Sequence, residues 1–131
     1  MTKSTNKTEN SNKYIPKNTA IININSTENN TILLAKDLKG NHLGLNSVGL
    51  VLKKKRGKRS LATGAYLSSE EIANKLIELG YTKIYIKVKG CGRGRESALY
   101  GLVCSNLIIE QILDVTPIAH NGCRKKKSRR I

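Results

Sequence analysis

The sequence has no Trp and no Phe, only two Pro and three Cys, and nine acidic residues against 24 Lys and Arg. No apolar run approaches the roughly 18 residues of a membrane-spanning helix, which argues against a membrane protein. Cys91, Cys104 and Cys123 form no C-x-x-C pair, so their spacing favours free thiols in a reducing compartment over a zinc site or a disulfide framework. We expect the Cys104 thiol to lie in the core.

Positive charge is what the sequence has in excess. The net charge is +15 over 131 residues, and the sequence pI is about 10.0. This charge is too large for a typical metabolic enzyme and indicates a polyanionic partner, nucleic acid first and an anionic membrane surface second. The hydrophobic fraction of 38% is still enough for a buried core, so we expect one folded domain at this length.

The charge is concentrated in two blocks and one glycine-rich turn, whereas residues 21–50 and 61–88 are each neutral. Blocks of like charge repel one another and indicate arms that bind a polyanion, although a solvated surface that keeps the protein soluble is the alternative. The first block contains Lys53, Lys54, Lys55, Arg56, Lys58 and Arg59. The second contains Arg124, Lys125, Lys126, Lys127, Arg129 and Arg130.

Three strands are predicted after residues 1–18, a polar, basic stretch that we expect to be a flexible extension. Thr19–Asn25 alternates apolar and polar side chains, and Thr31–Asp37 and His42–Leu52 are also strand-like. The turns between these segments are short. Short turns between consecutive strands indicate an antiparallel meander.

Helices and strands alternate in the second half. Apolar spacing predicts a helix from Ala62 that ends at Gly80, followed by a strand over Thr82–Lys89, a helix over about Arg95–Ser105 and a strand over Leu107–Val115. The predicted fold is α/β, with a mixed five-stranded sheet in the order β-β-β-α-β-α-β and flanking helices. This domain would span 19–117, and a basic tail would span 118–131.

The turn Gly90-Cys91-Gly92-Arg93-Gly94-Arg95 follows a strand and opens a helix. Its G-x-G-x-G spacing is one residue short of the dinucleotide-binding fingerprint. Such a site also needs an acidic residue about 20 positions further on to hold a ribose, and we expect Asp114 to lie at the wrong end of its strand for this role. Both points argue against a nucleotide cofactor. The glycines would expose backbone N–H groups beside a helix N-terminus, and Arg93 and Arg95 would add donors for phosphate oxygens. We interpret the turn as a clamp for backbone phosphates, the alternative being a tight structural turn.

Three segments together resemble one protein family. They are Asn29-Asn30-Thr31, the turn from Lys89 to Ser97, and Asp114-Val115-Thr116-Pro117-Ile118-Ala119-His120-Asn121-Gly122-Cys123-Arg124 with its basic tail. In this order, over roughly 19–131, they resemble the universal family of ribosomal protein eleven of the small subunit. The third segment is long and specific.

The resemblance implies a ribonuclease-H-like fold and a structural role, with no catalytic residue, cofactor or metal. Such proteins bind small-subunit rRNA on the platform, near the mRNA exit path and the exit tRNA site, beside small-subunit proteins seven and eighteen. We expect no membrane partner and no homo-oligomer. Together with the first basic block and the tail cations given above, the predicted RNA-binding residues are Asn29, Asn30, Lys89, Gly90, Gly92, Arg93, Gly94, Arg95, Ser97, His120, Asn121 and Gly122.

The chain departs from the family where the family usually has proline. Cys91, Arg93 and Ala119 stand at such positions, as do Lys125 and Lys126 after the tail arginine. Loss of these prolines raises the entropy cost of ordering the turn and the tail on RNA, and the added cations would offset part of it. RNA bases would have to stack on Tyr, His or Arg side chains, because Phe and Trp are absent.

The compartment and two other functions stay open at this stage. Lys, Ile, Asn and Tyr are abundant, as expected of an AT-rich genome, and no secretory or transit signal is visible, which together favour a protein encoded in an organelle. The lost motif prolines favour a divergent mitochondrial ribosome, with a plastid or the bacterial cytoplasm as the alternative. A small enzyme that uses the glycine turn for a nucleotide, or a free basic protein on DNA or a membrane, would also carry this charge.

Overall fold

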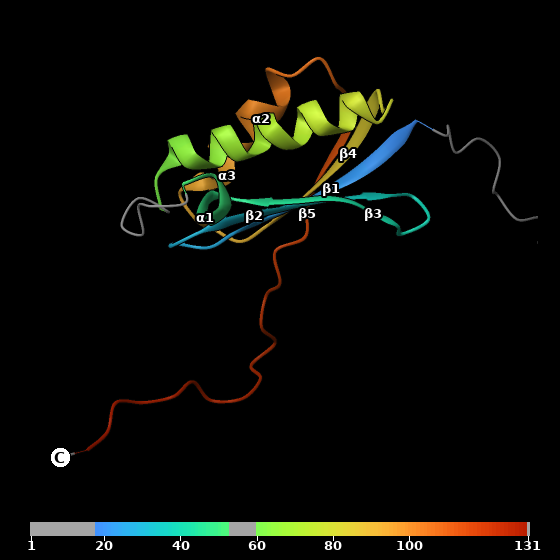
Figure 1. The fold of residues 1–131 in the computed structure, drawn as a ribbon. Helices are drawn as coiled ribbons and strands as arrows, with labels where there is room; N and C mark the ends of the chain where they lie inside the picture. Colours follow the sequence, from blue (N-terminus) through green and yellow to red (C-terminus); the bar gives the residue numbers. More distant parts are fainter. Residues whose placement is uncertain (1–17, 53–59, 131) are drawn as a thin grey trace, which may run out of the picture.

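One five-stranded sheet with helices on a single face forms the folded part of the chain (Figure 1). The computed structural model describes residues 18–52 and 60–130. The strands lie in the order β3-β2-β1-β4-β5. The elements are β1 (Thr19–Ser26), β2 (Thr31–Asp37), β3 (His42–Ser47), α1 (Val48–Val51), α2 (Ala62–Glu78), β4 (Lys83–Lys89), α3 (Gly94–Val103) and β5 (Ile108–Asp114). The predicted α/β class and element order are confirmed, with α1 as an addition.

The first three strands form the expected antiparallel meander. β1 pairs antiparallel with β2, and β2 pairs antiparallel with β3. Side chains alternate between the two faces of a strand, so Ile22 and Ile24 point into the core, where they are 0% and 1% exposed. β1 also pairs in parallel with β4, which places it at the centre of the sheet.

The third strand is shorter than predicted, and the expectation that it reaches Leu52 is wrong. It ends at Ser47, whose side chain accepts a hydrogen bond from the backbone N–H of Leu50 and caps the one-turn helix α1. Val48 is fully buried and α1 packs against α2, so tertiary packing overrides the strand-like composition of this run.

Helix α2 begins at Ala62, as the apolar spacing predicts, and a glycine ends it. Gly80 has a φ of +85°, the left-handed conformation that glycine adopts without a steric penalty. Its N–H donates to the carbonyl of Ile77, and the N–H of Tyr81 donates to the carbonyl of Leu76. These two bonds form a Schellman motif, which confirms the predicted role of Gly80.

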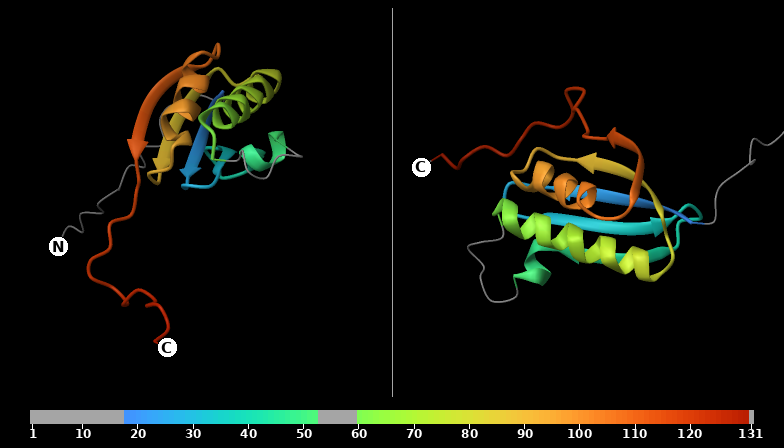
Figure 2. Two further views of the ribbon diagram at one scale, coloured as in Figure 1. Left: turned by 90° about the vertical axis from the view of Figure 1, so that its left-hand side faces the viewer. Right: turned by 90° about the horizontal axis from the view of Figure 1, so that it is seen from above.

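The second half builds the parallel part of the sheet. β4 pairs in parallel with both β1 and β5, and α2 and α3 cover the strands from one side (Figure 2). The core lies between this helical layer and the sheet. Its largest fully buried side chains are Ile22, Ile24, Leu33, Leu76, Ile84, Ile86, Leu102, Val48 and Val88.

Four strands end at the same end of the sheet. β1, β4 and β5 run in parallel, and β3 shares their direction because both β1 and β3 are antiparallel to β2. Register places Ser47 opposite Ile32, Ile32 opposite Asn25, and Asn25 opposite Lys89, so these residues form one row. We call this the carboxyl end of the sheet. The chain enters β1 at the opposite end.

The position of Cys104 differs from the expectation. Cys104 is exposed rather than buried, because it follows the last residue of α3 at the C-cap, so the expectation that it lies in the core is wrong. Within residues 18–52 and 60–130, no helix combines the length and the apolar composition that crossing a membrane requires.

Candidate nucleic-acid interface

The glycine turn packs tightly against the hairpin between β1 and β2. The N–H of Gly92 donates to the carbonyl oxygen of Ser26 at 3.2 Å. A Cβ on Gly92 would collide with the backbone carbonyl of Thr27, and one on Gly90, whose φ is +95°, with the carbonyl of Ser26. These two glycines are therefore required by the close approach of two backbone segments within the protein.

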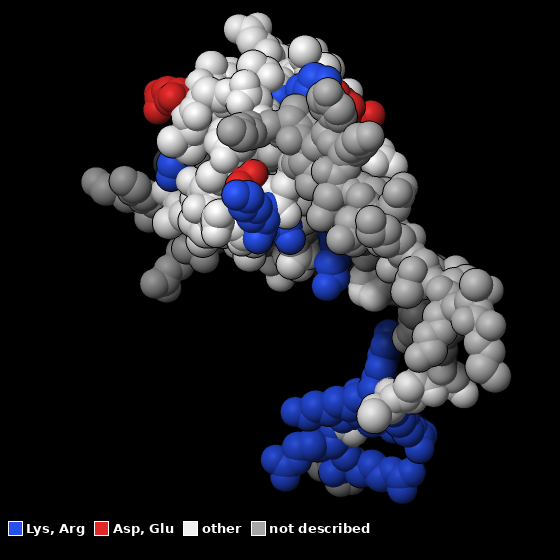
Figure 3. Space-filling view, turned by 90° about the vertical axis from the view of Figure 1, so that its right-hand side faces the viewer, with Lys and Arg blue, Asp and Glu red and all other residues white. Residues whose placement is uncertain are grey.

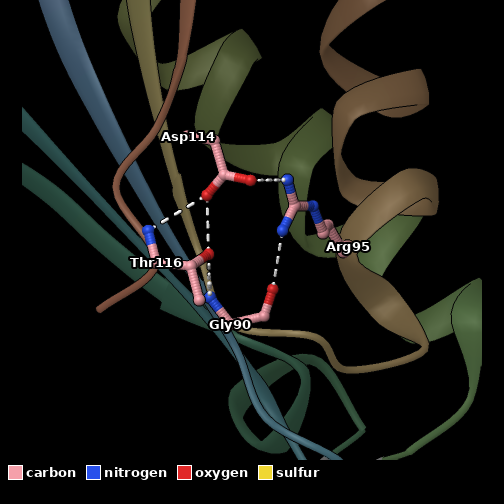
Figure 4. A network of polar contacts seen from close by, with 4 residues as sticks. All are labelled: Gly90, Arg95, Asp114 and Thr116. Atoms are coloured by element: carbon pink, nitrogen blue, oxygen red, sulfur yellow. Dashed lines mark hydrogen bonds and ion pairs between the residues drawn. The ribbon is translucent and has the colours of Figure 1, made fainter. Parts of the chain in front are cut away.

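A polar network joins this turn to the end of β5 (Figure 4). The Arg95 guanidinium donates to the Gly90 carbonyl at 2.9 Å and to the Asp114 carboxylate at 2.6 Å. The backbone N–H and the hydroxyl of Thr116 donate to the other carboxylate oxygen at 3.0 and 2.6 Å, and the Gly90 N–H donates to the Thr116 hydroxyl at 3.2 Å. The network thus holds together the end of β4, the start of α3 and the end of β5, from which the chain continues into the tail.

The same contacts explain the acidity of the carboxyl group. The hydrogen bond from Arg95, followed by those from Thr116, holds the pKa of Asp114 well below its ordinary value. The carboxylate is therefore charged over the whole physiological range and balances the guanidinium beside it. The sequence predicted Arg95 as a phosphate donor; within the protein it braces the turn, and its contact with RNA stays a prediction.

The β1–β2 hairpin closes with its own short-range bonds. The N–H and the hydroxyl of Thr27 both donate to the carbonyl of Asn30, at 2.8 and 2.9 Å, and the Asn30 N–H donates back to the Thr27 hydroxyl at 3.2 Å. Among the described residues, the side-chain oxygen of Asn30 is buried and has no hydrogen-bond partner. A buried acceptor of this kind is costly unless something donates to it.

A surface hollow of about 440 Å³ lies where the hairpin meets the glycine turn. It is lined by Glu28, Asn29, Ser60, Cys91 and Arg93. Two predicted RNA-binding residues, Asn29 and Arg93, thus lie together although they are far apart in the sequence. Ser60 is the first described residue after 53–59, so the chain leaves the first basic block at this same hollow.

The tail leaves the carboxyl end of the sheet and makes no secondary structure. Every described residue from Val115 to Arg130 is exposed, and Asn121 has a φ of +54°, which suits the Asn-Gly turn at this point. Figure 3 shows Lys and Arg gathered on the tail, away from the mostly uncharged surface of the body seen in that view. The second basic block is thus fully available to a partner.

All but one of the predicted site residues that the structure describes lie either at this end of the sheet or on the tail that leaves it. Asn29, Asn30, Lys89, Gly90, Gly92, Arg93, Gly94 and Arg95 belong to the hairpin and the turn, and His120, Asn121, Gly122, Arg124, Lys125, Lys126, Lys127, Arg129 and Arg130 belong to the tail. Ser97 lies apart, in a groove of about 580 Å³ between α2 and α3 that Tyr66 and Tyr100 also line. Lys53, Lys54, Lys55, Arg56, Lys58 and Arg59 lie outside the described residues.

Sequence reasoning missed the bracing role of Asp114 and Thr116. From the sequence, Asp114 stands out only as a carboxylate about 20 residues after the glycine turn. The expectation that it lies at the wrong end of its strand is wrong, because it ends β5 at the carboxyl end of the sheet, within hydrogen-bond distance of Arg95. The signal that could have found its role was the parallel topology, since parallel strands bring the end of β5 beside the end of β4.

A nearly neutral body of sheet and helices, with a cationic tail and a basic turn at one end, defines the class of small basic α/β proteins suited to bind a polyanion. Comparison with known proteins narrows this class. The family described as ribosomal protein S11 matches residues 20–130. The chain therefore belongs to the ribosomal protein S11 family, as the sequence resemblance predicts.

Individual relatives agree with this assignment. The chain is 46% identical to small ribosomal subunit protein uS11m of Prototheca wickerhamii over 126 residues, which is 95% of this chain and 97% of that protein. It is 40% identical to small ribosomal subunit protein uS11 of Kosmotoga olearia over 111 residues, 85% of each chain. It is also 40% identical to uS11 of Borreliella burgdorferi over 124 residues, 93% of this chain and 95% of that protein.

Proposed function

We propose that this protein is a structural constituent of the small ribosomal subunit that binds rRNA with the carboxyl end of its sheet and with its tail. One observation carries the proposal: β1, β3, β4 and β5 run in the same direction and deliver the hairpin, the glycine turn and the start of the tail to one end of the molecule. Membership of a ribosomal protein family supports rRNA as the polyanion. By resemblance, its place is the platform, near the mRNA exit path and the exit tRNA site, beside proteins seven and eighteen.

The parts of this surface would have different roles. The braced turn and the hairpin form a rigid element, which would fix the register on rRNA with Lys89 and Arg93, both exposed. The six tail cations would supply sequence-independent affinity by neutralising phosphates and releasing counterions.

The geometry also bears on the competing nucleotide site. In nucleotide-binding turns the glycine N–H groups point at the phosphates, whereas here the Gly92 N–H donates to Ser26 and the Gly90 N–H to Thr116. The family is a structural, non-enzymatic one. We therefore propose no enzymatic activity and no cofactor.

The decisive experiment replaces the six tail cations from Arg124 to Arg130 with glutamine. The variant should fold normally, because this segment is exposed, but should no longer co-sediment with small subunits. Its affinity for small-subunit rRNA should depend less on salt. The slope of log K against log salt should flatten by up to about 4–5, roughly 0.7 for each single-stranded and 0.9 for each double-stranded phosphate that is no longer neutralised. Normal co-sedimentation of this variant would refute the proposal.

A control removes charge at the opposite end of the sheet. Lys39→Gln, in the exposed turn between β2 and β3, should leave both co-sedimentation and salt dependence unchanged. If Lys39→Gln reduced co-sedimentation and salt dependence as much, per charge removed, as the tail variant does, rRNA binding would depend on net charge alone and not on the proposed surface.

For the compartment we propose a mitochondrial ribosome. The relative from Prototheca, whose name marks the mitochondrial form, is 46% identical, against 40% for the two bacterial relatives. Fractionation of cells followed by gradient sedimentation of each fraction tests this. Recovery of the protein in ribosomes outside mitochondria would overturn it.

A further inference from the structure

The sheet has a second face that none of the described helices covers. In Figure 1 the long helices α2 and α3 lie on one side of the strands, and the tail leaves towards the other. The covered face holds the buried side chains of β1 and β4, such as Ile22 and Ile86, so the alternate residues of the same strands point to the uncovered face. On β1 these include Asn23 and Asn25, and on β4 they are Lys83, Tyr85, Lys87 and Lys89.

Register brings these residues together across the two central strands. Asn23 lies opposite Lys87, Asn25 opposite Lys89, and Ile21 opposite Tyr85. Residues directly opposite each other on neighbouring strands share a face and lie within contact distance. The result is a patch of amide and ammonium groups beside an aromatic ring, which ends at the carboxyl end of the sheet.

The charge on this face is positive and largely unopposed. The five strands, which are described in full, contain three acidic residues. Asp37 and Asp114 lie opposite Ala20 and Val88, which belong to the covered face. Glu110 accepts a hydrogen bond from Lys83, and this bond raises the pKa of that lysine. Lys87 has no acidic neighbour in its register.

We propose that this face binds an unpaired RNA segment across β1 and β4, with phosphates on Lys87 and Lys89 and a base stacked on Tyr85. The proposal rests on the proposed function, since it extends the rRNA surface from the carboxyl end onto the sheet. Single-stranded RNA suits the patch because its bases are free to stack on an aromatic ring, while amides such as Asn23 hydrogen-bond their edges. A protein partner would have to bury lysines in the middle of its interface, which is costly unless each is paired.

The apolar half of the same face suggests the competing occupant. Leu34 lies opposite Leu45, which is 53% exposed, and Ile32 next to them is 39% exposed. These side chains on β2 and β3 would suit a protein surface. On the half of the face formed by β1 and β4, the positive charge favours RNA as the occupant. A protein partner is therefore treated as an outcome of the test.

The test measures binding of the full chain to transcripts of small-subunit rRNA over a range of salt concentrations. Lys87→Gln should flatten the slope of log K against log salt by about 0.7, the value for one phosphate of a single strand. Tyr85→Leu should weaken binding by about 5- to 150-fold, the effect of removing one stacked base, while retaining apolar area. Lys39→Gln and Tyr100→Leu are matched controls; Lys39 lies in the distant turn and Tyr100 is exposed on α3, on the covered side.

The outcomes separate this inference from the proposed function. If the wild-type chain fails to bind rRNA, the proposed function and the inference both fail. If the tail variant loses affinity while Lys87→Gln and Tyr85→Leu match their controls, the proposed function stands and the inference is overturned. The inference is also overturned if Leu45→Gln abolishes incorporation into subunits while Tyr85→Leu leaves both rRNA binding and incorporation intact, because the face would then dock a protein.

Discussion

Replacement of Gly92 by alanine tests whether the glycines of the turn serve the fold. A Cβ at this position would overlap the backbone carbonyl of Thr27 and press on the Ser26 hydroxyl. Both neighbours belong to the closed hairpin, and the Gly92 N–H is itself bonded to Ser26, so neither segment can move away freely. The variant should therefore strain the junction between the turn and the hairpin.

The magnitude follows from the kind of clash. Forcing one extra carbon into a well-packed site costs about 1–3 kcal/mol of unfolding free energy. For a domain of this size each kcal/mol lowers Tm by about 4–8 °C. Thermal unfolding followed by circular dichroism on the purified chain measures this directly.

Gly122→Ala is the matched control, because a Cβ there would meet nothing within 4 Å. It should unfold at the wild-type Tm. If Gly92→Ala were as stable as Gly122→Ala, the inference that tight packing of the turn on the hairpin requires a glycine at position 92 would be refuted. The glycines would then be explained better by the approach of a ligand.

Three further predictions concern the frame that holds this end of the sheet. Asp114→Asn should lower stability at neutral pH, because it removes the charged acceptor of Arg95. Since the hydrogen bond from Arg95 lowers the pKa of Asp114 in the folded state, its stabilising effect is complete above the ordinary value of 3.8 and is lost as pH falls below it. Urea unfolding of wild type and variant should therefore differ at pH 7 and converge in acid; an equal difference at both pH values would exclude the ionic contribution. Gly80→Ala should cost about 1–2 kcal/mol from its left-handed φ alone, since its surroundings are open, and an unchanged urea midpoint would contradict the Schellman cap. Ile86→Ala, at a fully buried position of β4, should cost about 2–5 kcal/mol, and a decrease below about 1 kcal/mol would show that this part of the core is loosely packed.

Local patterns were sufficient for most of the fold. The alternation in β1 and β4 follows directly from one buried and one exposed face, and the ends of α2 follow from apolar spacing and Gly80. Sequence patterns gave the wrong secondary structure where tertiary packing determines the conformation. The run from Val48 to Leu52 is largely apolar and strand-like, yet the Ser47 cap and the contact with α2 turn it into helix. A single serine before so short a run is too weak a local signal to distinguish these alternatives.

The candidate site was predictable by residue type and not by arrangement. Glycine, arginine and lysine in the turn indicated phosphate binding from chemistry alone. That Arg95 would instead reach Asp114 depends on the parallel pairing of β4 with β5, a contact between residues 19 positions apart. The meeting of Asn29 and Arg93 at one hollow likewise requires the three-dimensional sheet.

The three exposed cysteines have a practical consequence. Cys91 lines the hollow beside the hairpin, Cys123 lies in the tail, and Cys104 lies at the end of α3 on the covered side of the sheet. The native chain thus carries a thiol at each of three distinct places. A maleimide fluorophore on Cys104, after Cys91 and Cys123 are changed to serine, would give a labelled protein for following ribosome assembly with the dye held away from the RNA-facing end.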